Sequence, residues 1–356
     1  MLKRGHNRIH IREILFNLFH QKKLLLIILI SFFVGIVVGI VYSLFFSVSP
    51  ELVCGDGTNY GECSDMQPYY CEEGKLVEKA SACGCVDGLT VQGDSCFSKY
   101  QNNPENITLN YTLRGEKEEI DFEVYGGMNF YLSRFSRSIA VENGVNPSKE
   151  DFKLKKINEE EQKNLLLPLV TKIQNLDVSE KDKLRIAVSL VQEISFGNSD
   201  KIVGVAGILL NYSRYPYEVL SELEGVCGEK SELLVFILRE MGYGVGFFYY
   251  PAENHEAVAV KCPKLHSVGR TGYCLIETTG PSIITDQEIE YIGVGKLKSK
   301  PEVIVVSEGK SIGYWWYEYW DANRLGRLKN GWALFRETGL EKFGEKYNLA
   351  EVYNPN

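Results

Sequence analysis

Apolar residues in the stretch 224–246, EGVCGEKSELLVFILREMGYGVG, recur at the spacing of one helical face. They fall at positions 233, 234, 237, 238 and 241, and Gly242 follows where a C-terminal cap is expected. Cys227 lies seven residues before Leu234 and therefore shares this face. The pattern predicts an amphipathic helix with a cysteine where a polar loop becomes the helix.

Two helices are predicted before this segment and three strands after it. Residues 179–194 begin with Ser179 and acidic residues, which is a helix start signal, and residues 214–225 suggest a short helix with Pro216 in its first turn, ended by Gly225. Strand signals follow at 244–251 (GVGFFYYP), 255–262 (HEAVAVKC) and 273–279 (YCLIETT). This order predicts an α+β fold in which the cysteine-bearing helix packs on a small antiparallel sheet.

The flanking regions give weaker patterns. Residues 97–106 read as a linker, and two strand-like runs at 107–114 and 120–135 are separated by the charged turn GEKEE and followed by a polar region. The aromatic and charged tail from residue 314 onward is expected to cover the domain as one or two helices, because packing is the common role of such aromatic side chains.

Residues 24–48 carry no charge over 25 positions, enough to cross a hydrocarbon layer of ~30 Å. Residues 1–23 contain six Lys or Arg against one Glu, so the positive-inside rule keeps the N-terminus in the cytoplasm. A cleaved signal peptide is the alternative, but the apolar run is longer than the usual ~7–15 residues. We expect an uncleaved, single-pass signal anchor in the cell membrane, with the C-terminal part extracytoplasmic.

Charge argues against nucleic acid as a partner. Subtracting residues 1–23 from the 39 basic and 47 acidic residues of the chain leaves 33 and 46, a net charge of −13. Binding of phosphate backbones requires a basic face. We therefore expect no nucleic-acid partner.

The nine cysteines divide unevenly along the chain. Six of them fall within 43 residues in a segment too short to build its own core, which predicts three disulfides in an oxidising compartment: Cys54, Cys63, Cys71, Cys83, Cys85 and Cys96. Their connectivity is left open, and a zinc module is the alternative. Cys262 and Cys274 flank a hairpin-like connection and are candidates for a fourth disulfide, or for a metal site with His266. Cys227 is then the odd cysteine, which favours a reactive thiol over a small buried core residue.

A nucleophilic thiol needs a base, and the base needs an orienting acceptor. His255 begins the second strand and Glu277 ends the third, so antiparallel pairing would set them side by side on the odd-numbered face, where we expect the N-terminus of the Cys227 helix. Direct pairing of Cys262 with Cys274 would instead set Glu277 opposite Ala259, ~13 Å along the strand from His255. Either the connection is irregular or that disulfide does not form.

The runs YPYEVL, GVCGEKSELL, LREMGY, NHEAVAV and YCLIETT, within about residues 180–285, resemble the transglutaminase-like superfamily, especially its membrane-anchored archaeal and bacterial members. The resemblance implies a papain-like cysteine hydrolase domain with Cys227 as nucleophile, His255 as general base and acid, and Glu277 as orienting acid. It also suggests Gln192 on the oxyanion side; a surface or capping glutamine is the alternative. The chain departs from most members in having Glu, not Asp, at the third position and no aromatic residue soon after the histidine.

The expected organisation is therefore a basic tail (1–23), a membrane span (24–48), a Cys-rich module (51–98) and a transglutaminase-like domain (105–356) with its core at about 180–285. The expected activity is that of a cysteine peptidase, amidase or protein crosslinker acting through a thioester, with no cofactor and no metal. Two alternatives are an inactive peptide- or protein-binding module on the same fold and a purely structural surface protein.

Overall fold

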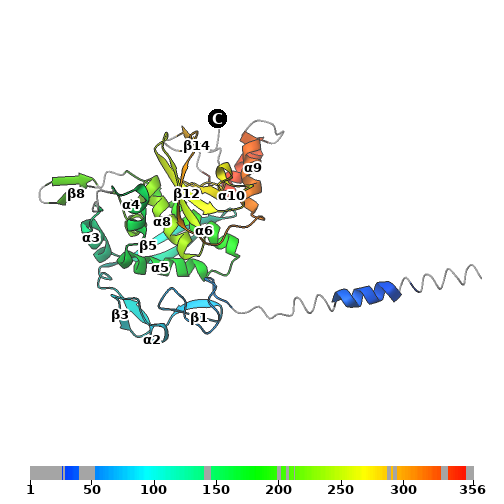
Figure 1. Ribbon diagram of the computed structural model, residues 1–356, viewed down its shortest axis with the longest axis horizontal. Coiled ribbons are helices and arrows are strands. Elements are labelled where there is room, and N and C mark those ends of the chain that lie inside the picture. Colours follow the sequence, from blue (N-terminus) through cyan, green and yellow to red (C-terminus); the bar gives the residue numbers. More distant parts are fainter. Residues whose placement is uncertain are drawn as a thin grey trace, which may run out of the picture. The chain divides into compact units, whose positions relative to one another are not determined.

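A computed structural model describes residues 26, 29–39, 53–139, 146–198, 202–205, 208–211, 213–286, 290–291, 295–329 and 336–349. The chain divides into two units, Met1–Leu52 and Val53–Asn356. Helices and strands are mixed along the second unit, which confirms the α+β class (Figure 1).

The first unit contains the predicted membrane span. Leu26 and residues 29–39 are helical, and the apolar side chains described there are exposed. The rest of the segment 24–48 and the tail 1–23 lie outside the described residues. Among the described residues, none of the helices combines the length and the apolar character that crossing a bilayer requires.

A four-stranded antiparallel sheet stands at the centre of the second unit, in the order β13-β12-β11-β16 (Figure 1). Its strands are β11 (Val245–Tyr250), β12 (His255–Lys261), β13 (Tyr273–Ile276) and β16 (Glu302–Ser307). The three strands predicted after the Cys227 helix are thus confirmed. The fourth, β16, was not predicted and pairs with β11 from a distant part of the chain.

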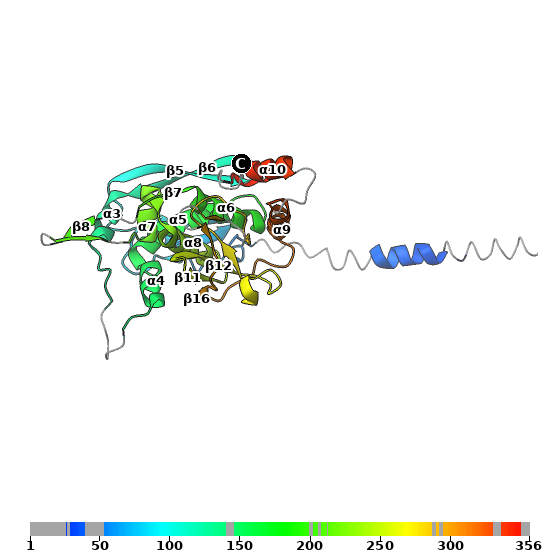
Figure 2. The ribbon, with the colours of Figure 1, turned by 90° about the horizontal axis from the view of Figure 1, so that it is seen from above.

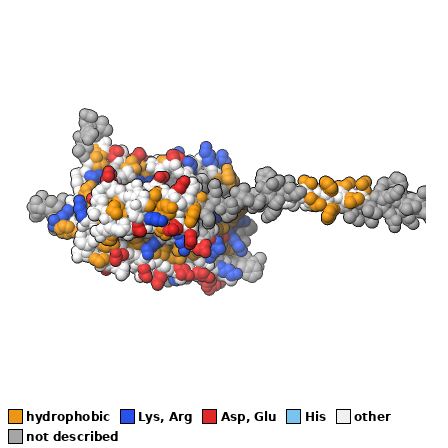
Figure 3. Space-filling view, turned by 90° about the horizontal axis from the view of Figure 1, so that it is seen from below, with side chains coloured by type: hydrophobic (Ala, Val, Ile, Leu, Met, Phe, Trp, Pro, Cys, Tyr) orange, Lys and Arg blue, Asp and Glu red, His pale blue; other side chains and the backbone are white. Residues whose placement is uncertain are grey.

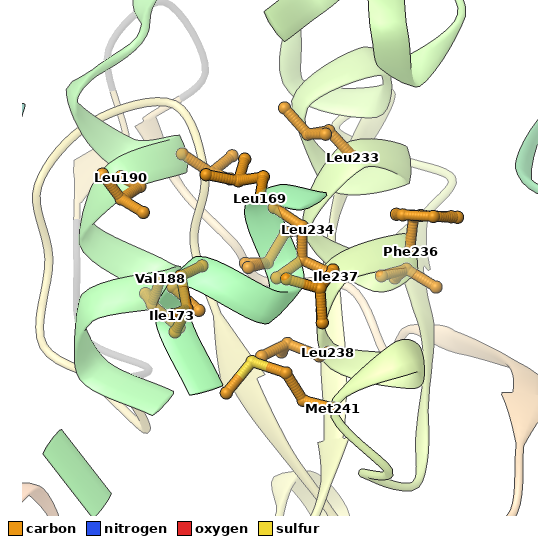
Figure 4. Close-up of a cluster of buried hydrophobic side chains, with 14 of the residues drawn as sticks. Leu169, Ile173, Val188, Leu190, Leu233, Leu234, Phe236, Ile237, Leu238 and Met241 are labelled. Atoms are coloured by element: carbon orange, nitrogen blue, oxygen red, sulfur yellow. The ribbon is translucent and has the colours of Figure 1, made fainter. Parts of the chain in front are cut away.

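The helix predicted from the apolar periodicity is α8 (Cys227–Glu240), and Gly242 follows it with a φ of +83°. Leu233, Leu234, Ile237, Leu238 and Met241 are all buried and pack against side chains of two neighbouring helices (Figure 4). These are α5 (Glu160–Gln174) and α6 (Glu180–Glu193), the latter capped by Ser179 as predicted. The short helix α7 (Pro216–Glu222) ends at Leu223 in the left-handed conformation, two residues before the predicted Gly225.

The two faces of the sheet are covered by different helices. Even-numbered Val258 and Val260 share a buried cluster with α8, while odd-numbered Ala257 and Ala259 pack with the C-terminal helices α9 (Tyr317–Lys329) and α10 (Arg336–Tyr347). The body of the Cys227 helix thus covers the even-numbered face, whereas the prediction placed the N-terminus of that helix on the odd-numbered face. Both faces of the Ala-Val alternation are apolar, so the pattern does not select the face that the helix covers.

The hairpin predicted before the core is present as β5 (Pro104–Leu113) and β6 (Glu116–Tyr125), and α10 lies beside it (Figure 2). The predicted second strand over 120–135 is wrong beyond Tyr125, because Gly126–Arg134 forms α3 and buries Met128 and Leu132, which are four residues apart. The polar region that follows folds into α4 (Lys149–Ile157) and α5, neither of which was predicted.

The Cys-rich segment is part of the second unit. Its three disulfides are Cys54–Cys71, Cys63–Cys83 and Cys85–Cys96. All six cysteines are used, so the zinc alternative is wrong for this segment. The Asn175 side chain exchanges two hydrogen bonds of 2.8 Å with the Leu76 backbone, which ties the segment to the end of α5.

The remaining short elements complete the described chain. They are β1 (Tyr69–Glu72), β2 (Lys75–Glu78), α2 (Ala80–Cys83), β3 (Thr90–Gln92), β4 (Ser95–Phe97), β7 (Ser195–Phe196), β8 (Ile202–Val205), β9 (Ile208–Asn211), β10 (Glu224–Gly225), η1 (Val268–Arg270), β14 (Glu290–Tyr291) and β15 (Gly295–Lys296). Acidic and basic side chains both lie on the face shown in Figure 3.

The register of β12 and β13 resolves the conflict between the disulfide and the pairing of His255 with Glu277. Cys274 lies opposite Val260, and the disulfide runs diagonally to Cys262, whose Cα atom is 5.8 Å away. Extending this register sets Glu277 opposite Ala257, two positions and about 7 Å along the strand from His255. The fourth disulfide and a His255–Glu277 contact therefore coexist.

We expect the double substitution Cys262→Ala/Cys274→Ala to lower the free energy of unfolding by about 3 kcal/mol, because this disulfide closes a short loop in the unfolded chain. Urea denaturation measures the loss, and Cys227→Ala, which removes no cross-link, is the control. Alkylation of Cys262 in the denatured, non-reduced wild type would contradict the assignment.

Candidate active site

Cys227 is the first residue of α8, and the extended Val226 precedes it as N-cap. The structure describes all nine cysteines, and Cys227 is the one outside a disulfide. Its side chain is partly exposed. The free N–H groups and the positive end of the helix dipole at this position favour negative charge on a sulfur, which is the form that acts as a nucleophile.

His255 opens β12 and is completely buried. Its Nε2 atom lies 2.9 Å from Oε2 of Glu277, which is also buried. The other carboxylate oxygen, Oε1, accepts hydrogen bonds from the backbone N–H groups of Thr278 at 3.0 Å and Thr279 at 2.8 Å. Because Glu277 takes Nε2, Nδ1 is the ring nitrogen left for an interaction with Cys227.

The electrostatic environment keeps the His255 ring protonated. Burial alone would lower its pKa, but hydrogen bonds to Cys227 and Glu277, together with the charges of both partners, outweigh burial and raise the pKa of His255 from 6.5 to about 10. The structure thus brings together the three residues predicted from the sequence. The arrangement places a protonated imidazole next to the cysteine at neutral pH.

Two hydroxyl groups join the first turn of α8 to the end of β13. Thr278, which directly follows Glu277, donates from its hydroxyl to the Cys227 carbonyl at 3.3 Å, and its Oγ1 lies 3.0 Å from Oγ of Ser231. These contacts hold the cysteine at the strand end although the body of α8 covers the even-numbered face. Sequence reasoning missed both residues; the one signal was a serine four positions after the cysteine, on the same side of the helix.

Gln192 is buried, so the surface alternative for it is wrong. Its amide nitrogen donates to the Glu277 carbonyl at 2.8 Å and to the Ser282 hydroxyl at 2.9 Å, while its oxygen accepts from Arg185. The side chain therefore holds the backbone of the acidic residue. These contacts engage both hydrogen-bonding ends of the amide.

Charged side chains pack behind the cysteine. Lys153 of α4 bridges Glu232 at 2.7 Å and Glu256 at 2.6 Å; burial opposes its charge, but the two carboxylates outweigh burial and raise the pKa of Lys153. A Cβ atom on Gly228 would lie 2.6 Å from Oε2 of Glu256. The glycine next to Cys227 therefore leaves room for the Lys153–Glu256 ion pair to lie close to α8. Sequence reasoning missed the cluster because its members are up to 103 residues apart.

A buried lysine side chain caps the C-terminal end of α6. Lys230, on the first turns of α8, donates to the carbonyl groups of Ile194 at 2.6 Å and Gln192 at 3.3 Å. Burial lowers its pKa to about 7. The ammonium group caps the negative end of the α6 dipole and so locks α6 to the helix that carries the cysteine.

Within the described part of the chain, no group of three or more His, Cys, Asp or Glu side chains is arranged to hold a metal ion. The metal site considered at Cys262, His266 and Cys274 is wrong, because both sulfurs are in the disulfide. His266 instead stacks on Tyr319, with ring centroids 3.9 Å apart.

Comparison of the chain with protein-family models, with curated proteins and with solved structures finds no match. The case for the site therefore consists of its residue types, contacts and burial.

Removing the thiol should lower the pKa of the His255 ring, because the hydrogen bond to Cys227 is the largest of the causes that raise it. In the wild type, the ring proton should persist as the pH rises above 6.5 and be lost near pH 10. In Cys227→Ala it should be lost at lower pH. NMR titration of the histidine ring measures both, and identical titration curves would mean that the sulfur and the ring do not interact.

Two glycine substitutions should have opposite effects on stability. Gly228→Ala should cost up to about 1 kcal/mol, because its methyl group meets the Glu256 carboxylate, and this flexible side-chain end, which is paired with Lys153, has to shift. Gly326→Ala, inside α9 with open space around it, should stabilise by about 0.5–1 kcal/mol. Urea denaturation measures the free energy of unfolding of both variants. An unchanged free energy of unfolding for Gly228→Ala would show that the ion pair does not restrict the space at this position.

Proposed function

We propose that the chain is a membrane-anchored, extracytoplasmic cysteine enzyme of the transglutaminase-like, papain-like type. The observation that carries the proposal is the buried contact of His255 with Glu277, together with the free Cys227 thiol at the first position of α8, whose carbonyl accepts a hydrogen bond from Thr278, the residue after Glu277. A structural cysteine has no need of a buried imidazole whose far nitrogen is fixed by a carboxylate. The order Cys, His, acid along the chain supports the same assignment.

In the proposed reaction, the Cys227 thiolate attacks the acyl carbon of an amide. A carbon–sulfur bond forms, and the backbone N–H of Cys227 helps to hold the oxyanion. The His255 imidazolium then gives its proton to the amine as the carbon–nitrogen bond breaks, which leaves a thioester. Neutral His255 next takes a proton from the nucleophile that resolves the thioester. As the nucleophile bonds to the acyl carbon, the carbon–sulfur bond breaks and the Cys227 thiolate is released beside the reprotonated His255. Water gives hydrolysis and an amine gives a crosslink; hydrolysis needs no second binding site and is the default.

The proposed location follows from the sequence and suits the sulfur chemistry. Residues 24–48 would anchor the chain, with residues 1–23 in the cytoplasm. Four disulfides are typical of an oxidising compartment. A protein or peptide at the cell surface would be the substrate.

Labelling of the full-length chain by a chloroacetamide probe at pH 7 tests the proposal. The wild type should be labelled at Cys227, and His255→Ala should slow labelling by about 10²-fold, in line with the loss of a general acid–base group. Glu277→Gln should slow it less. His266→Ala is the matched control, because it removes the other histidine of the second unit and should leave the rate unchanged.

Slow labelling that is indifferent to His255→Ala would contradict catalysis and favour a binding module on the same fold. Acyl transfer is then followed directly on a peptide amide in the presence of a labelled primary amine. Release of the free acid indicates hydrolysis and incorporation of the label indicates crosslinking, whereas neither product from a wild type that labels rapidly would contradict the proposed enzyme.

A further inference from the structure

The segment that follows β13 carries the proposed catalytic acid but forms no regular structure. Residues 277–284 lie outside the sheet, yet Glu277, Ser282 and Ile284 are all buried. Because no strand pairing fixes this segment, its backbone groups need other partners. Three buried polar side chains from two helices supply them.

Glu318 of α9 holds the far end of the segment. Its side chain is completely buried, and Oε2 accepts hydrogen bonds from the Ile284 N–H at 2.8 Å and from Arg185 of α6 at 3.3 Å. A buried carboxylate is costly unless it is paired and hydrogen-bonded. The ion pair with Arg185 therefore ties α9 to both α6 and the segment.

Arg185 and Gln192 extend the contacts toward the site. The guanidinium of Arg185 donates to the Ser282 carbonyl at 2.9 Å and to the side-chain oxygen of Gln192. The Gln192 amide nitrogen then donates to the Glu277 carbonyl at 2.8 Å. The side chains of Arg185 and Gln192 lie seven residues apart on α6, so both are presented on the same face of that helix.

We propose that Glu318 is a positioning residue for the proposed reaction: through Arg185 and Gln192 it fixes the segment that presents the Glu277 carboxylate to His255. The inference rests on the proposed function for the role of Glu277, but the chain of contacts is independent of any reaction. It makes α9, which lies outside residues 180–285, a part of the site. Glu318 itself acts at a distance from the nucleophile.

The test compares Glu318→Leu with Glu318→Gln, which keeps an oxygen acceptor for Ile284 and Arg185. Leu325→Ala is the matched control, because it loosens the apolar packing of α9 without touching these polar contacts. We expect Glu318→Leu to lower the NMR titration midpoint of His255 by about one pH unit and to slow chloroacetamide labelling of Cys227 about tenfold. Glu318→Gln and Leu325→Ala should retain the wild-type midpoint.

Gln192→Met provides a second variant that leaves the Arg185–Glu318 pair in place, and it should shift the His255 midpoint in the same direction as Glu318→Leu. A wild-type midpoint in the folded Glu318→Leu protein, or in Gln192→Met if the former does not fold, would overturn the inference. An equal shift in Leu325→Ala would also overturn it, since a general loosening would then explain the effect. If the midpoints shift as expected but the wild type transfers no acyl group, the positioning stands and the proposed function fails.

Discussion

The hydrogen bond between Nε2 of His255 and Oε2 of Glu277 is the contact on which the candidate site depends. Both side chains are withdrawn from water, where an isolated charge is costly. Their pairing offsets that cost and leaves the opposite nitrogen of the ring for the sulfur. Neighbouring groups hold this pair in position. Two backbone N–H groups donate to the second carboxylate oxygen, and Gln192 donates to the backbone carbonyl of the same glutamate. The histidine thereby has one orientation and one proton to give.

Much of the core was predictable because its signals are local. The periodicity of 233–241 and the cap at Gly242 define α8, Ser179 starts α6, and short apolar runs mark β11, β12 and β13. The cysteine count singled out Cys227. Apart from the cysteine count, each of these signals depends on residues that are only a few positions apart.

What could not be predicted depends on distant parts of the chain. The face of the sheet that α8 covers and the diagonal disulfide follow from packing and register, which an alternation of Ala and Val does not specify. The sequence of α4 resembles a polar linker because its lysines are charged. Lys153 can be buried because Glu232 and Glu256, from distant parts of the chain, pair with it. From its sequence context, Glu318 would likewise be expected at the surface. In the fold it is buried and paired with Arg185. Ion pairs between residues that are far apart in the chain produce no recognisable pattern in the local sequence.

Eight of the nine cysteine sulfurs of this chain are oxidised and one is not, and the two states make opposite demands on maturation. Any exchange that drew Cys227 into a bridge would remove the free thiol and leave another cysteine unpaired in its place. Cys227 is free and partly exposed at the N-terminus of α8, so it is the cysteine from which such exchange would start. For Cys227 to stay free, the other eight cysteines have to pair among themselves, six within the Cys-rich segment and two between Cys262 and Cys274.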